Sequence, residues 1–159
     1  MIYSRSSEYA IRAFVSMAQA PAGTYAMVKN IAEQEDIPVH FLAKILQQLA
    51  RQGLLRSSKG PTGGVALRQP ALEIRLVDIV EALDGLDAYK RCALGRAECS
   101  DSMLCSMHDG WKAVRSSIME YLERNTIADL VKALDQKKKA LGGNRQRKAK
   151  RAPVAARRG

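Results

Sequence analysis

The stretch that decides the fold is residues 28–67, which read VKNIAEQEDIPVHFLAKILQQLARQGLLRSSKGPTGGVAL. Apolar residues recur at helical spacing in its first part, at Val28, Ile31 and Ala32. Residues 36–38 then interrupt that helix, and a second helix follows whose apolar face is Leu42, Ile45, Leu46 and Leu49. Gly53 is placed to end it. Two helices joined by a short turn predict a helix-turn-helix.

The remainder of the stretch predicts a β-hairpin. Residues 54–67 read as two short strands around a basic tip rich in Gly and Pro. Gly60, Gly63 and Gly64 let such a tip turn sharply and approach a phosphate chain closely. The expected fold class is therefore mainly α with a small β-hairpin wing, a winged helix-turn-helix.

Polar residues on the second helix and on the hairpin suit contact with double-stranded DNA. Such side chains bond base edges in the major groove or phosphates of the backbone. The alternative is a solvated helix face beside a surface loop, and the attached basic wing favours DNA binding over it. The predicted DNA-binding residues are Arg5, His40, Lys44, Gln47, Gln48, Arg51, Arg56, Ser58, Lys59 and Thr62.

Further helices flank this unit on both sides. An amphipathic helix precedes it, with the apolar face Ile11, Phe14, Val15 and Ala18. Another follows Pro70, with Leu76, Ile79, Val80 and Leu83. From Asp109 a long helix carries a single stripe of Trp111, Val114, Ile118, Tyr121 and Leu122. Thr126 and Asp129 resemble a capping box at the start of a last short helix.

Charge is distributed unevenly along the 159 residues. The chain holds 26 Lys and Arg against 16 Asp and Glu, a formal charge of +10. Residues 137–159 contain ten basic residues and no acidic one, so the excess lies entirely in this segment. We expect three parts: a DNA-binding domain at 1–79, a cysteine loop and long helix at 80–136, and a basic disordered tail at 137–159. The absence of an apolar run of membrane-spanning length predicts a cytoplasmic protein without membrane contact.

The three cysteines cluster between residues 92 and 105, where helical periodicity is lost. Cys92, Cys99, Cys105 and His108 form a C-x6-C-x5-C-x2-H arrangement that offers a complete set of metal ligands. Structural zinc sites favour shorter gaps between cysteines, whereas iron–sulfur clusters are held by thiolates with occasional histidine. Incidental thiols and a cysteine redox pair without metal are the alternatives.

With these residues assembled, the chain resembles the IscR/NsrR-type family of bacterial winged-helix repressors, also called the Rrf-type regulators. The resemblance covers about residues 1–136. It rests on Tyr9-Ala10, Ile37-Pro38 with the helix after it, the wing Lys59-Gly60-Pro61-Thr62-Gly63-Gly64, and the three cysteines with His108 and Trp111.

The resemblance implies a homodimer joined through the long helix, with each winged helix in successive major grooves of a palindromic operator. It implies an iron–sulfur cluster on the three cysteines that senses iron–sulfur status, nitric oxide or redox state. Family members differ in the fourth ligand, which maps to His108 or to Glu8 of the partner's first helix. We predict that His108 is the fourth ligand, because it needs no second subunit. We also predict a 2Fe-2S cluster in preference to a 4Fe-4S cluster.

Two other functions are the alternatives. A winged-helix repressor without a cluster would sense oxidants through cysteine chemistry or bind zinc. An enzyme is not expected, because the chain has no phosphate-binding glycine motif, dinucleotide fingerprint or base-activated nucleophile.

Overall fold

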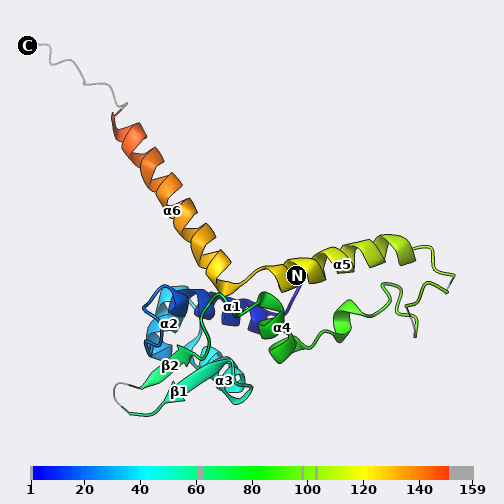
Figure 1. Ribbon diagram of the computed structural model, residues 1–159, viewed down its shortest axis with the longest axis horizontal. Coiled ribbons are helices and arrows are strands. Elements are labelled where there is room, and N and C mark those ends of the chain that lie inside the picture. Colours follow the sequence, from blue (N-terminus) through cyan, green and yellow to red (C-terminus); the bar gives the residue numbers. More distant parts are fainter. Residues whose placement is uncertain (1, 61–62, 98, 103, 151–159) are drawn as a thin grey trace, which may run out of the picture.

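The computed structural model describes residues 2–60, 63–97, 99–102 and 104–150. Its elements are α1 (Arg5–Ala18), α2 (Val28–Glu35), α3 (Val39–Arg51), β1 (Leu55–Ser58), β2 (Gly64–Leu67), α4 (Leu76–Asp84), a 3-10 turn (Asp87–Tyr89), α5 (His108–Arg124) and α6 (Ile127–Lys150). The winged helix is confirmed: α1 to α4 and the hairpin pack together, while α5 and α6 leave this domain in different directions (Figure 1).

The core of the winged helix is built from the apolar faces that the periodicity predicted. Phe14 of α1 and Ile79 of α4 are fully buried, and the apolar face of α3 packs in the same core. That face consists of Leu42, Ile45, Leu46 and Leu49. Burying each such side chain contributes about 1.5–3 kcal/mol, so α3 is held firmly against α1 and α4.

The hairpin is fixed to the helices by its second strand. β1 and β2 pair antiparallel from Leu55 opposite Leu67 to Ser58 opposite Gly64. Val65 also exchanges two backbone hydrogen bonds of 2.9 Å with Ala26, which precedes α2. A Cβ atom at Gly64 would overlap the carbonyl oxygen of Ala26, so glycine is required for this close approach. The wing is therefore tied to the start of the helix-turn-helix.

A backbone clasp closes the region between α4 and α6. The amide of Leu76 donates to the carbonyl of Asn125 at 3.0 Å, and the amide of Ile127 donates to the carbonyl of Ile74 at 2.9 Å. From this point the chain runs through α4, the cysteine loop and α5, and it returns to the same place just before α6. We call these paired segments, residues 74–76 and 125–127, the clasp.

The predicted capping box at the start of α6 is present. Asp129 accepts a hydrogen bond from the amide of Thr126 at 3.0 Å, and the Thr126 hydroxyl accepts one from the amide of Asp129 at 3.2 Å. This reciprocal pair satisfies two amides that the first turn of a helix leaves free.

The sequence predicted a short last helix and a basic tail at residues 137–159, and the structure describes residues 137–150 of that tail as helix. Helix α6 continues through them to Lys150. Ala, Leu, Lys, Gln and Arg dominate this segment and all favour helix, which outweighs the cost of Gly142 and Gly143. Residues 151–159 lie outside the described residues. Within the described part of the chain, no helix is long and apolar enough to span a membrane.

Candidate DNA-reading face and cysteine loop

The predicted DNA-binding side chains lie on the exposed surface of α1, α3 and the hairpin. Thr62, which is also predicted to contact DNA, lies outside the described residues. Because α3 buries its apolar face, its polar residues are turned away from the core. The exposed members are Arg5, His40, Lys44, Gln47, Gln48, Arg51, Arg56, Ser58 and Lys59.

Gln48 differs from the other predicted residues of α3 because its side chain contacts the neighbouring helix. Its Nε2 donates to the carbonyl oxygen of Ala82 at 3.1 Å, and Gln52 Nε2 donates to the same oxygen at 2.9 Å. Amide side chains from the end of α3 therefore hold the last turn of α4. The periodicity identified this side of α3 as polar but gave no sign that α4 would lie beside it.

The last residue of α4, Asp84, contacts the beginning of α1. Its carboxylate accepts hydrogen bonds from the Ser4 amide at 2.8 Å, the Ser4 hydroxyl at 2.5 Å and the Ser7 hydroxyl at 2.9 Å. Ser7 is completely buried. Arg5 follows Ser4 directly, so the α1 residue predicted to contact DNA lies beside this network.

The three cysteines are free thiols in the loop between α4 and α5. Cys92 is buried, whereas Cys99 and Cys105 are half-buried. Hydrogen bonds from the backbone of Arg96 and Leu94 lower the pKa of Cys92. Hydrogen bonds with the side chains of Cys105 and Cys99 lower this pKa further, whereas burial of the thiol raises it. The loop thus brings the three thiols together and favours the thiolate form of Cys92, the form that binds metals.

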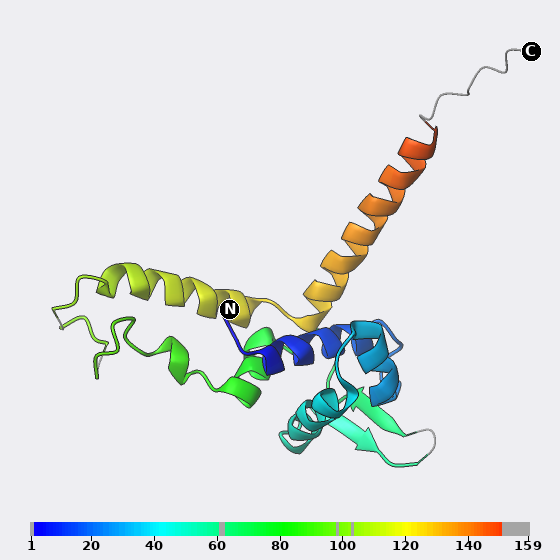
Figure 2. The same cartoon turned by 180° about the vertical axis from the view of Figure 1, so that it is seen from behind.

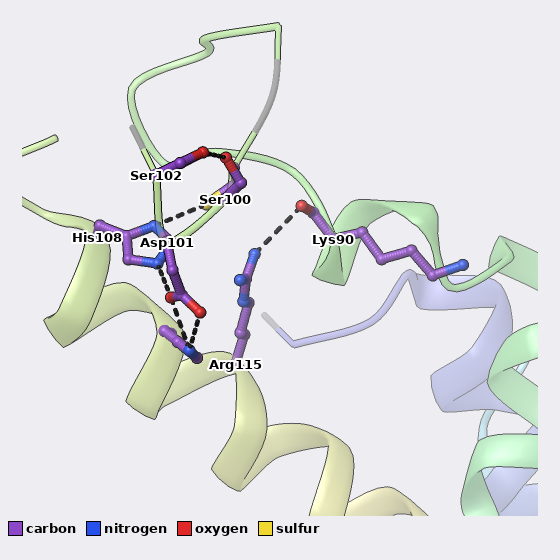
Figure 3. A network of polar contacts seen from close by, with 8 residues as sticks. Lys90, Ser100, Asp101, Ser102, His108 and Arg115 are labelled. Carbon is purple, nitrogen blue, oxygen red and sulfur yellow. Dashed lines mark hydrogen bonds and ion pairs between the residues drawn. The ribbon is translucent and has the colours of Figure 1, made fainter. Parts of the chain in front are cut away.

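His108 begins α5 and turns its ring into the cysteine loop. Its side chain is buried, with Nδ1 3.5 Å from the Sγ of Cys99 and Nε2 2.8 Å from an oxygen of Asp101 (Figure 3). The backbone amide of His108 donates to the carbonyl of Cys105 at 3.2 Å. The histidine three residues after the last cysteine therefore lies with the thiols.

Asp101 and Lys112 complete this cluster, and the sequence reasoning missed both. Lys112 Nζ lies 2.7 and 2.8 Å from the two oxygens of Asp101. The hydrogen bond from Lys112 lowers the pKa of the Asp101 carboxyl most, and the hydrogen bond from His108 lowers it further. A signal was available for Lys112 alone, since it stands one helical turn after His108. A histidine ligand is commonly oriented by a carboxylate on its second ring nitrogen, and Asp101 holds that position.

The loop is also fastened at its first residues. The indole Nε1 of Trp111 donates to the carbonyl of Arg91 at 2.8 Å, and Arg115 Nη1 donates to the carbonyl of Lys90 at 3.2 Å. The Tyr89 hydroxyl donates to the carbonyl of Ile2. The start of the loop therefore contacts both α5 and the segment before α1.

Glu8, the alternative fourth ligand, lies on α1 and is half-buried. Within one chain its carboxylate is 3.7 Å from the guanidinium of Arg12. Among the residues that the structure describes, no group of three or more His, Cys, Asp or Glu side chains is arranged to hold a metal ion. The loop thus gathers the predicted ligands without assembling them into a metal-binding geometry.

Comparison with known proteins identifies the family. Residues 3–133 match the model of the Rrf2 family, described as iron-dependent transcriptional regulator. The chain belongs to the Rrf2 family. A Mycobacterium tuberculosis protein named as an HTH-type transcriptional regulator is 36% identical over 131 residues, which cover 82% of this chain and 81% of the relative.

Solved structures agree with this membership in the Rrf2 family. T. potens IscR superposes with a TM-score of 0.68 at 25% identity, covering 84% of this chain and 88% of that one. The oxidized form of Staphylococcus aureus CymR superposes with a TM-score of 0.66 at 27% identity, covering 82% of this chain and 96% of that one. This Rrf2 protein is therefore a winged-helix transcriptional regulator and not an enzyme, as its sequence predicted.

Proposed function

We propose that this protein is a cytoplasmic homodimer that reads a palindromic DNA operator with α3 and the hairpin. In this proposal Cys92, Cys99, Cys105 and His108 hold an iron–sulfur cluster, of the 2Fe-2S type, and its occupancy sets the affinity for the operator. When bound, the cluster supplies a centre that iron supply, nitric oxide or oxidants can change. The gathering of all four ligand side chains in the loop, within a family described as iron-dependent, carries the proposal.

The chemistry of the ligand set supports an iron–sulfur cluster. Three thiols and one imidazole match ligands found in such centres, and the lowered pKa of Cys92 favours the thiolate that coordination requires. Asp101 accepts from the second ring nitrogen of His108, which fixes the orientation of the ring and leaves the Nδ1 side facing Cys99.

An uncovered apolar stripe on α5 supports the homodimer. In the single chain Val114 is 50% exposed and Tyr121 is 47% exposed, although both lie on the stripe that the sequence predicted. Leu122, near the clasp, is fully buried against the winged helix. A second copy related by twofold symmetry would cover the same stripe on both helices at once.

A continuous set of contacts leads from the loop to the reading helix. Trp111 and Arg115 hold the start of the loop to α5, and Asp84 holds the end of α4 to Ser4 and Ser7. Gln48 and Gln52 then connect the last turn of α4 to α3. A rearrangement of the loop can therefore change the position of α3, and such coupling is usually worth about 1–3 kcal/mol.

The first experiment is an absorption spectrum of anaerobically purified protein, with iron and acid-labile sulfide counted per chain. We expect a coloured, sulfide-containing protein that becomes colourless in Cys99→Ala. If His108 is the fourth ligand, His108→Ala alters the spectrum and Glu8→Ala leaves it unchanged. The reverse result would assign the fourth position to Glu8.

The regulatory part of the proposal is tested by DNA binding. We expect cluster-bound and cluster-free protein to differ at least about fivefold in operator affinity, because an equilibrium shifts only when its two states bind unequally. Equal affinity of both forms for every operator would refute cluster sensing. A protein free of colour and sulfide that loses DNA binding on oxidation would indicate a thiol switch without a cluster.

A further inference from the structure

The end of α6 is a basic helical arm that the family match does not include. The match ends at residue 133, whereas α6 continues to Lys150. We define the basic arm as residues 137–150, which extend about 21 Å at 1.5 Å per residue. In both views α6 leaves the winged helix on the side away from α3 and the hairpin (Figures 1 and 2). The basic arm therefore reaches space that the reading helix of the same chain does not.

The charge of the basic arm is of one sign. Its basic residues, Lys137, Lys138, Lys139, Arg145, Arg147, Lys148 and Lys150, are accompanied by no acidic residue. The three consecutive lysines are exposed, and Lys138 Nζ donates to the neutral side chain of Gln19 at 3.0 Å. Among the salt bridges of the described residues, none includes these three lysines. Their charges are available to an external polyanion.

The positions of the basic and apolar residues along the basic arm indicate which kind of partner it binds. At about 100° per residue, its basic positions occupy the whole circumference of the helix instead of one side. A helix that lies on a membrane needs an apolar face opposite its basic one, and the only large apolar residue here is Leu141. Leu141 alone also cannot fill an apolar groove on a protein partner. Phosphates of DNA require only positive charge at close spacing.

We propose that the basic arm binds the phosphate backbone of double-stranded DNA outside the half-sites that α3 reads. The arm points away from α3, so its contacts fall on flanking DNA or on a second DNA segment. Tethering to a DNA-bound domain raises the effective concentration of phosphates near the arm. This proposal rests on the proposed function in one respect only, namely that α3 contacts its half-site and thereby holds the arm near DNA.

The test compares two variants of the full chain that each lose three positive charges. The arm variant carries Lys137→Gln, Lys138→Gln and Lys139→Gln, and glutamine keeps the preference for helix. The matched control carries Lys90→Gln, Arg124→Gln and Lys132→Gln, outside the arm. Binding to a duplex of arbitrary sequence, about 40 base pairs or four helical turns long, is measured by fluorescence anisotropy over a range of salt concentrations.

We expect the slope of log affinity against log salt to fall by about 0.9 for each phosphate that the protein no longer neutralises. The slope should therefore fall by roughly 2–3 in the arm variant and by less than about 1 in the control. Circular dichroism should show unchanged helix content in both. Equal slopes for wild type and arm variant, or equal reductions in both variants, would overturn the proposal. Arm-dependent flotation with phosphatidylserine vesicles, with unchanged DNA slopes, would also overturn it and identify a membrane partner.

Failure of the arm can be distinguished from failure of the reading helix. A Lys44→Ala and Arg51→Ala double variant removes predicted operator contacts of α3 and leaves the basic arm intact. We expect it to lose operator preference, while its salt slope on the arbitrary duplex falls by no more than about 2. Disappearance of the entire salt slope in this variant would show that the arm neutralises no phosphate.

Discussion

Helices α3 and α5 are both amphipathic, yet their apolar faces are buried to different extents. The face of α3 is sealed within the chain, with Leu46 only 1% exposed. The face of α5 is sealed only near its end, where Leu122 is buried, while Val114 and Tyr121 remain about half exposed. Periodicity predicted both stripes equally well. What covers a stripe depends on the rest of the fold, or on a second molecule.

The two helices should therefore respond to substitution in different ways. Removal of a side chain from the buried face of α3 should destabilise the whole domain, because the core relaxes only partly around the gap. A change on the exposed part of α5 should leave the domain folded and act on assembly.

The largest effect is expected for Leu46→Ala. A buried leucine replaced by alanine costs about 2–5 kcal/mol, through reduced burial and the remaining cavity. Urea unfolding followed by circular dichroism measures the change. The control on the same helix is Val39→Ala, whose side chain is 43% exposed and which should cost less than about 0.5 kcal/mol. Similar costs for both substitutions would contradict the burial of α3.

The next effect is expected for Val114→Glu on the uncovered stripe of α5. An unpaired charge in the proposed interface should raise the dimer dissociation constant at least about tenfold, while the unfolding of the monomer changes little. Sedimentation velocity measures the assembly state. Ser116→Glu introduces the same charge on the opposite side of α5 and should leave the dimer intact. A dimer that survives Val114→Glu would place the interface elsewhere.

A smaller effect is expected where α3 and α4 meet. Gln52→Ala removes the hydrogen bond to the carbonyl of Ala82 and should lower the free energy of unfolding by about 0.5–1 kcal/mol, measured by urea unfolding. The matched control for the unfolding measurement alone is Gln47→Ala, an exposed residue of α3. If α4 transmits changes in the loop to α3, Gln52→Ala also reduces the difference in operator affinity between cluster-bound and cluster-free protein.

The smallest effect concerns the pH dependence of α6. Hydrogen bonds from the side chain and backbone of Thr126 lower the pKa of Asp129. A lowered folded-state pKa means that Asp129 contributes stability above its unfolded pKa, and that this contribution disappears as pH falls through the folded value. Thermal unfolding at pH values from about 5 downward should therefore be less pH-dependent in Asp129→Asn. Unchanged pH dependence would show that the capping pair contributes nothing.

Local patterns were sufficient to predict the helices of the winged helix and the hairpin, whereas the metal ligands Cys92, Cys99, Cys105 and His108 stay a prediction. The contacts of Gln48 and Asp84 were not predictable, because they depend on where α4 lies relative to α3 and α1. The extension of α6 to Lys150 did not follow from the apolar periodicity, although the Lys, Arg, Ala and Gln residues of this segment favour helix. Asp101 was missed because its partners His108 and Lys112 become neighbours only once α5 begins at His108.

The clasp has a consequence for how this chain can be divided and rebuilt. Both ends of the chain between Leu76 and Asn125 are joined by backbone hydrogen bonds at one point, so this segment is a closed excursion that includes α4, a part of the winged-helix core, as well as the cysteine loop and α5. A protease that cuts the excursion once would leave two fragments still docked to each other through the clasp. Because α4 is part of the core, changes of length between these two positions belong after α4, in the cysteine loop and at the start of α5.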